Sequence, residues 1–183
     1  LRAGQMPEAL RYLRTATARA TSWSYDVQCL YAVALAQAGR VADGIDLLAP
    51  LLSRGGYAPL LYLTLASLYD RDEQLAKAYD TMAKMQSMMG SGGPASAQQA
   101  LGALAMPTPE RQYLLALAYE AGGQLAEART AWLNYAGLGP RARYAGRAEG
   151  HAAAIDKLLA DRLASKAATA KAKPKPKPKA TTP

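Results

Sequence analysis

Apolar side chains recur every three or four residues along most of this chain, and short breaks rich in Gly or charged residues separate the recurrences. This spacing places apolar side chains on one face of an α-helix. The clearest case is residues 109–140, where two helix-length patterns flank Gly122 and Gly123. The pattern predicts an all-α protein in which this segment forms a helical hairpin.

Weaker versions of the same pattern precede it. Residues 1–21 predict a turn and one helix, and residues 24–54 predict a hairpin broken at Gly39. Residues 58–89 predict a second hairpin with its turn at residues 70–74. Each hairpin carries one apolar face and therefore needs a neighbour to cover it.

Residues 90–108 interrupt the hairpins, because three glycines and Pro94 predict a loop and residues 95–104 predict a short helix. Residues 143–168 predict one long helix that caps the last hairpin. Pro at every second position blocks regular structure in the final residues, so we expect a helical domain over residues 1–168 and a disordered tail over residues 169–183.

The turns that precede the second helices are regularly spaced. Gly4 and Gly39 are 35 residues apart, Gly39 and Glu73 are 34 apart, and Glu73 and Gly123 are 50 apart. The last value equals 34 plus a 16-residue insertion, which falls within residues 90–108. A helical hairpin that recurs near every 34 residues resembles the tetratricopeptide repeat.

Individual residues carry the resemblance. The bulky, small and aromatic positions of the repeat are matched in the second hairpin by Tyr62, Leu65, Ala66, Tyr69 and Ala78, and in the third by Leu115, Ala116, Tyr119, Ala128, Trp132 and Pro140. Gly44 stands where the family usually has Ala. The resemblance covers roughly residues 1–140 and implies a right-handed α-solenoid of about three and a half repeats.

In this family a partner peptide lies in the concave groove lined by the first helix of each hairpin. The resemblance places Asp26, Gln37, Leu63, Ser67, Asp70, Arg71, Tyr113, Leu117 and Glu120 in that groove. This set is apolar to mildly acidic, so we expect an extended or helical apolar partner segment with some basic character. The Lys and Asn residues of a chaperone-type carboxylate clamp are missing, so we do not expect a clamp of that kind. We expect no catalytic role, no cofactor and no bound metal.

Four methionines cluster before the insertion. Met82, Met85 and Met89 share one helical face, and Met88 adjoins them. One interpretation is core packing within the repeat. The other is an adaptable apolar docking flank formed by Met85, Met88 and Met89.

Candidates for chemistry are few. His151 is the only histidine, and in a polar helix we expect it to be exposed. Cys29 is the only cysteine, which excludes an intramolecular disulfide, and we expect it to be a small buried side chain. No His/Cys cluster with metal-ligand spacing and no phosphate-binding glycine loop is present in the sequence.

The formal charge of +8 is unevenly placed, because Lys171, Lys173, Lys175, Lys177 and Lys179 supply five of the positive charges. The tail is interpreted either as a solvated spacer or as a contact with an anionic surface, such as a membrane, an acidic protein or nucleic acid. It contains no aromatic residue, which argues against specific binding of single-stranded nucleic acid.

Compartment and partner follow only by association. Alternating Lys–Pro tracts are similar to envelope-spanning spacers of bacterial proteins, which favours the periplasm or cell envelope over the cytoplasm. Leu1 is not a start residue and the chain opens in mid-pattern, so we expect a missing N-terminal portion. The sequence therefore predicts a non-enzymatic scaffold or adaptor in a bacterial assembly; the alternative is a binder of nucleic acid or anionic surfaces driven by the tail.

Overall fold

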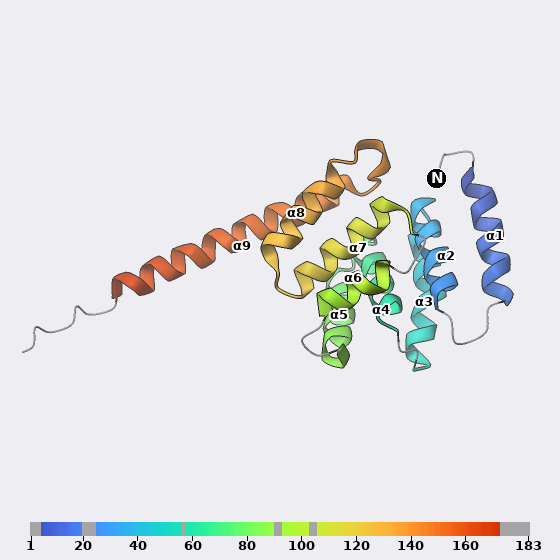
Figure 1. Cartoon of the computed structure of the whole chain (residues 1–183), viewed down its shortest axis with the longest axis horizontal. Helices are drawn as coiled ribbons and strands as arrows, with labels where there is room; N and C mark the ends of the chain where they lie inside the picture. The colour runs from blue at the N-terminus through green and yellow to red at the C-terminus, as the bar shows by residue number, and fades with distance from the viewer. Residues whose placement is uncertain (1–4, 20–24, 56–57, 90–92, 103–105, 173–183) are drawn as a thin grey trace, which may run out of the picture.

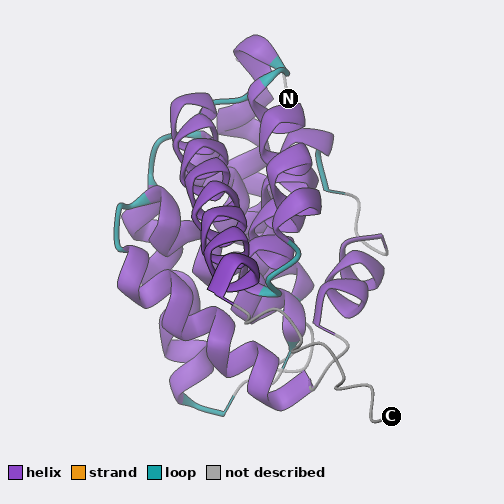
Figure 2. Ribbon diagram, turned by 90° about the vertical axis from the view of Figure 1, so that its left-hand side faces the viewer, coloured by secondary structure: helices purple, strands orange, loops and turns teal. Residues whose placement is uncertain are grey.

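All regular structure in the described residues is helical (Figures 1 and 2). The structure is a computed structural model, and it describes residues 5–19, 25–55, 58–89, 93–102 and 106–172. Within them lie α1 (Met6–Arg19), α2 (Asp26–Gln37), α3 (Val41–Ser53), α4 (Pro59–Arg71), α5 (Leu75–Met89), α6 (Gly93–Gly102), α7 (Thr108–Ala121), α8 (Leu125–Ala136), the 3-10 turn η3 (Gly139–Arg141) and α9 (Ala145–Ala172).

Consecutive helices pack as pairs. The closest pairs are α2 with α3, α4 with α5, and α7 with α8, and α9 packs along α8. Helix α4 also lies against α2 and α3, whereas α7 contacts α4 and, more sparsely, α5. The prediction of an all-α chain whose consecutive helices pack as pairs is confirmed.

Three turns between paired helices share one backbone conformation. Gly39, Glu73 and Gly123 have φ values of 83°, 60° and 73°. The amide after each of them donates to a carbonyl five residues earlier, at 2.8–2.9 Å. This left-handed ending satisfies the last carbonyls of a helix, and it costs a residue with a Cβ atom, such as Glu73, about 1–2 kcal/mol. Gly39, Glu73 and Gly123, which the repeat spacing aligns, therefore have equivalent conformations, and Gly4 lies outside the described residues.

The core requires a close approach of α3 to its neighbours at Gly44. A Cβ atom there would lie 3.1 Å from the carbonyl oxygen of Ala32 in α2 and 3.2 Å from Cδ1 of Leu68 in α4. Leu48, one turn later on α3, is fully buried. Helix α3 continues through Pro50 and ends at Ser53, so the proline does not end the helix.

The insertion folds against the stack, because α6 packs on α4 and α7 and buries Ala97 and Leu101. Its predicted short helix is confirmed. Helix α9 has 28 residues, so it is about 42 Å long. Only its first half packs on α8, and its second half extends beyond the other helices (Figure 1).

We expect Gly44→Val to lower the free energy of unfolding by about 2 kcal/mol, because a branched side chain overpacks the contact between α2, α3 and α4. The matched control is Gly150→Val in α9, where an added Cβ meets nothing within 4 Å. Urea unfolding followed by circular dichroism measures both variants. Equal stabilities of the two variants would contradict the close approach at Gly44.

Candidate functional site

Most of the residues predicted to line a concave groove are buried inside the protein. The exposed fractions of Leu63, Ser67, Asp70, Tyr113 and Leu117 are 0–1%. Arg71 is also buried, Gln37 and Glu120 are half-buried, and Asp26 is exposed. Partner binding at these positions stays a prediction, but in this structure most of them are covered by the chain itself.

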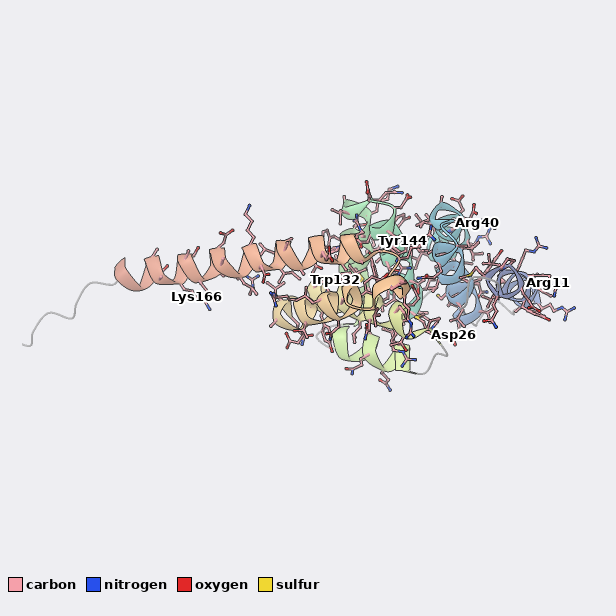
Figure 3. All side chains as sticks on the ribbon, turned by 90° about the horizontal axis from the view of Figure 1, so that it is seen from above. Arg11, Asp26, Arg40, Trp132, Tyr144 and Lys166 are labelled. Atoms are coloured by element: carbon pink, nitrogen blue, oxygen red, sulfur yellow. The ribbon has the colours of Figure 1, made fainter. Side chains whose placement is uncertain are left out.

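The segment that leads into α9 supplies part of that cover. The Tyr144 hydroxyl donates to the Ala36 carbonyl at the end of α2, at 2.8 Å, and Arg143 Nη1 donates to the Gln37 carbonyl at 3.1 Å. Arg147 reaches Asp70 of α4 at 2.7 Å. Trp132 and Tyr144 lie where α9 joins the packed helices, far from Lys166 on the projecting part (Figure 3). The first helices of two hairpins are thus tied to the start of α9.

Asp70 is the centre of one buried cluster. Its carboxylate accepts hydrogen bonds from the Tyr113 hydroxyl, from Arg147 Nη2 at 2.7 Å and from His151 Nε2 at 3.1 Å. Burial alone opposes ionisation, but the hydrogen bonds from His151, Arg147 and Tyr113 outweigh it and hold the pKa of Asp70 well below its usual range. Asp70 is therefore an anion that joins α4, α7 and α9.

His151 bridges Asp70 to a second carboxylate, that of Glu120 in α7, through its Nδ1 at 2.9 Å. Its ring stacks on Trp132 of α8, with centroids 4.4 Å apart and 12° between the planes. Burial disfavours the charged ring, but the bonds to Asp70 and Glu120 outweigh it and raise the pKa of His151 to about 9. The expectation of an exposed His151 is wrong, since 7% of its surface is exposed.

The Glu120 carboxylate has polar partners on three other helices. Besides His151, it accepts a hydrogen bond from Trp132 Nε1 at 2.7 Å and one from the Tyr79 hydroxyl of α5 at 3.0 Å. The carboxylate predicted to face a partner thus binds α5, α8 and α9 of its own chain. Helical spacing places Tyr144, Arg147 and His151 on one side of the chain at the start of α9, but it does not show which residues that side contacts.

A second buried ion pair adjoins the Asp70 cluster, because Arg71 directly follows Asp70 in α4. Arg71 Nη2 of α4 is 2.7 Å from Glu110 Oε2 of α7, and both side chains are almost completely buried. The guanidinium lies 4.2 Å from the ring centroid of Tyr113 and 4.8 Å from that of Tyr144. Gln37 donates a hydrogen bond to Glu110. These contacts offset part of the desolvation of both charges, although Nε and Nη1 of Arg71 have no hydrogen-bond partner among the described residues.

Neither reactive candidate has the environment of a nucleophile or base. Both ring nitrogens of His151 face carboxylates, so at neutral pH it is a cation without a free lone pair. Burial raises the pKa of the Cys29 thiol to about 12, and the expectation of a buried small side chain there is confirmed. Within the described ranges, no group of three His, Cys, Asp or Glu side chains is arranged to hold a metal ion.

The methionine cluster divides between core and surface. Met82 and Met85 are buried, whereas 43% of the surface of Met88 is exposed. The Met89 side chain lies outside the described residues. The core-packing interpretation therefore holds for Met82 and Met85, and docking at this flank stays a prediction.

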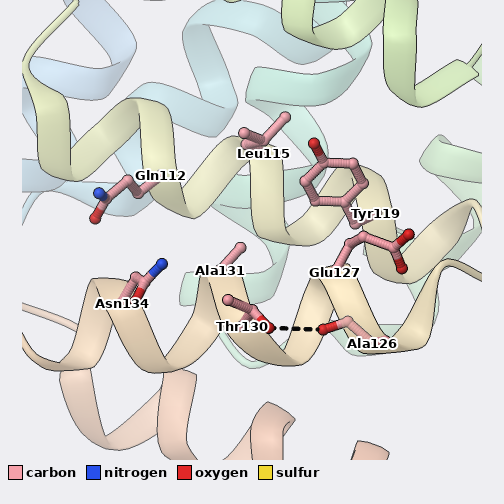
Figure 4. A pocket seen from close by; sticks show the side chains of 8 residues that line it. All are labelled: Gln112, Leu115, Tyr119, Ala126, Glu127, Thr130, Ala131 and Asn134. Atoms are coloured by element: carbon pink, nitrogen blue, oxygen red, sulfur yellow. Dashed lines mark hydrogen bonds between the residues drawn. The ribbon is translucent and has the colours of Figure 1, made fainter.

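An open hollow of about 470 Å³ lies between α7 and α8. Its floor is apolar and its ends are polar, with Gln112 and Asn134 at one end and Glu127 beside Tyr119 at the other (Figure 4). It is lined by Gln112, Leu115, Tyr119, Ala126, Glu127, Thr130, Ala131 and Asn134. The floor side chains Leu115, Tyr119 and Ala131 are half-buried, which leaves apolar surface accessible to a partner.

The preceding hairpin shows what covers the corresponding surface. Leu65 of α4, which the repeat spacing aligns with Leu115, is 2% exposed. It lies one turn before Leu68, whose Cδ atoms face Gly44 of α3. In α7 the equivalent Leu115 lines the hollow instead, and α7 packs on the α6 insertion and on α4, with only sparse contact to α5.

Two other hollows are lined by polar groups that already have partners. One, of about 280 Å³, lies over Glu120, Arg147 and His151, and another, of about 500 Å³, lies at Gln37 and Glu110.

Comparison of the chain with protein-family models, with curated proteins and with solved structures finds no match. Within the described residues, no helix is sufficiently long and apolar to span a membrane.

We expect His151→Phe to lower the free energy of unfolding by about 3 kcal/mol at pH 6, because Phe keeps the stacking on Trp132 but leaves two buried carboxylates without their bridging cation. The folded-state pKa of His151 is about 9 against 6.5 for the free side chain. Its stabilising effect is therefore complete below pH 6.5 and is lost as the pH rises through 9.

Urea unfolding of wild type and His151→Phe at pH 6, 8 and 10 measures this dependence. The difference between the two proteins should shrink with rising pH, because their other titrating groups are shared. A difference that stays constant over this range would show that His151 is neutral in the folded protein.

We expect Glu110→Leu to lower the free energy of unfolding by about 3–5 kcal/mol, because it leaves the Arg71 guanidinium buried without a counterion. The double variant Arg71→Met/Glu110→Leu should be more stable than Glu110→Leu, since it removes both charges. Equilibrium unfolding of Arg71→Met, Glu110→Leu and the double variant gives the coupling free energy between the two side chains. Additive losses would contradict a direct buried pair.

Proposed function

We propose that this protein is a non-enzymatic interaction scaffold of the tetratricopeptide class. It binds a helical segment of a partner protein in the hollow between α7 and α8. The observation that carries the proposal is the accessible apolar floor formed by Leu115, Tyr119 and Ala131. The family assignment is supported by the shared left-handed turns at Gly39, Glu73 and Gly123.

The form of the partner follows from the preceding hairpin. There the equivalent face of α4 packs on α3, which presents Ile45, Leu48 and Leu52 at helical spacing. A partner helix with a similar aliphatic stripe therefore fits the floor of the hollow. Glu127 at one end favours a Lys or Arg residue at the corresponding end of the partner helix.

The alternative places are supported less well. A peptide in the concave groove would have to displace the bonds that Tyr144, Arg147 and His151 make to α2, α4 and α7. The methionine flank offers Met88 but not Met85, which belongs to the core. Catalysis by His151 is disfavoured because neither ring nitrogen is free.

We expect Leu115→Lys to weaken partner binding by at least about tenfold, because a charge replaces apolar surface in the middle of the hollow. The matched control is Leu133→Lys on another face of α8, where 40% of the leucine is exposed and the hollow does not include it. Capture of partners by the whole chain, compared by mass spectrometry, should show proteins lost with Leu115→Lys and kept with Leu133→Lys.

A photo-crosslinking residue at Thr130 then identifies the bound segment. We expect it to map to a helix with an aliphatic stripe in a protein that Leu115→Lys fails to capture. If wild type and Leu115→Lys capture the same proteins with the same affinity, the hollow is not the binding site. Thermal unfolding of both lysine variants checks that they keep the fold.

A further inference from the structure

The net charge of the chain is concentrated at one end. Residues 157–183 contain eight Lys and Arg residues and one acidic residue, Asp161, for a formal charge of +7. The preceding 156 residues contain 14 basic and 13 acidic residues, for a formal charge of +1. The body of the protein is therefore nearly neutral, whereas its C-terminal end attracts polyanions.

The described part of this basic end is a helix without tertiary cover. Nε and Nη2 of Arg129 in α8 donate to the two carboxylate oxygens of Asp156 in α9, at 2.5 and 3.1 Å, close to the start of α8 at Leu125. Beyond this contact, every side chain from Lys157 to Thr169 is exposed except the half-buried Leu159. Figure 1 shows this half of α9 projecting from the other helices.

The projecting half keeps the apolar stripe of the packed half. Ala152 and Ile155 are buried against the body, and Leu159, Leu163 and Ala167 continue the same face at intervals of four residues. Leu163 is 69% exposed, the largest value for a large apolar side chain among the described residues. Beyond the half-buried Leu159, no other described helix covers this apolar stripe.

Basic side chains border this stripe. Arg162 and Lys166 lie along one edge and Lys157 along the other, as the helical spacing of 100° per residue places them. Within the described residues none of the three forms an ion pair, whereas the hydroxyls of Ser165 and Thr169 on the opposite face bond their own helix. Cations beside an apolar stripe are typical of helices that lie in a membrane interface.

Nucleic acid fits these observations less well than a lipid surface. After Tyr144 the sequence contains no aromatic residue, no Asn and no Gln, so it lacks side chains that stack on bases or read their edges. Phosphate contacts would use the lysines, but they would leave Leu163 in water. An anionic bilayer uses both features, because its headgroups bind cations and its acyl region accepts leucine.

We propose that residues 157–169 of α9 bind the surface of an anionic lipid bilayer. Leu163 and Ala167 face the acyl chains, and Arg162 and Lys166 contact headgroup phosphates. This binding site is separate from the hollow between α7 and α8. The scaffold would thereby be held at a membrane surface while its body binds a protein.

Sedimentation of the whole chain with vesicles tests the proposal. We expect binding to vesicles of phosphatidylglycerol and phosphatidylcholine, and none to vesicles of phosphatidylcholine alone. Each basic side chain near an anionic surface contributes about a fivefold gain in partitioning, so Arg162→Glu/Lys166→Glu should reduce binding by at least about 25-fold. Leu163→Ser, which leaves the charge unchanged, should reduce it by about fivefold.

The matched control is Arg14→Glu/Arg54→Glu, which changes the net charge equally at exposed positions of α1 and at the end of α3. It should keep most of the binding, and an equal loss would overturn a site on α9. If Leu163→Ser leaves binding unchanged, and the protein binds duplex DNA more tightly than the vesicles, the exposed half of α9 binds nucleic acid instead. Leu115→Lys should leave vesicle binding unchanged, so the two proposals fail independently.

Discussion

The structure depends on one buried cation, the imidazolium of His151, held between Asp70 and Glu120. Two carboxylates at this depth would repel one another and would cost free energy through lost hydration unless a positive charge lay between them. The three residues belong to α4, α7 and α9, so their pairing fixes the start of α9 against two helical pairs. Helix α9 is thereby joined to both α4 and α7. The α6 insertion lies between these two pairs in the sequence and packs on α4 and α7.

The contacts of α9 with α4 and α7 determine which surfaces of these helices remain accessible to other molecules. The inner faces of α4 and α7 are used by Arg147, His151 and Tyr144, by the α6 insertion and by the Arg71–Glu110 pair. Helix α7 makes only sparse contact with α5, and apolar surface that remains accessible lies between α7 and α8, around Leu115.

Local features of the sequence predicted the helices well, because their causes are local. Periodic apolar residues and the 34-residue spacing of Gly39 and Glu73 identified the helical pairs and their turns, and Glu73 shows that even a non-glycine position in this spacing adopts the left-handed conformation. The site was not predictable in the same way. His151 finds its partners 81 residues earlier at Asp70 and 31 residues earlier at Glu120, and no periodicity reports such contacts.

The same cluster explains why a projecting half of α9 can exist as a helix. Forming the first turn of an isolated helix is unfavourable, and short helices in water are marginal for this reason. In α9 that cost is met by the packed half, where His151, Ala152 and Ile155 are buried. The projecting half then grows by propagation alone, and its residues are mostly Ala, Leu, Lys and Arg, which are strong helix formers. Loss of the His151 bridge would therefore both loosen the contacts between α4, α7 and α9 and remove the packed base from which the basic half of α9 extends.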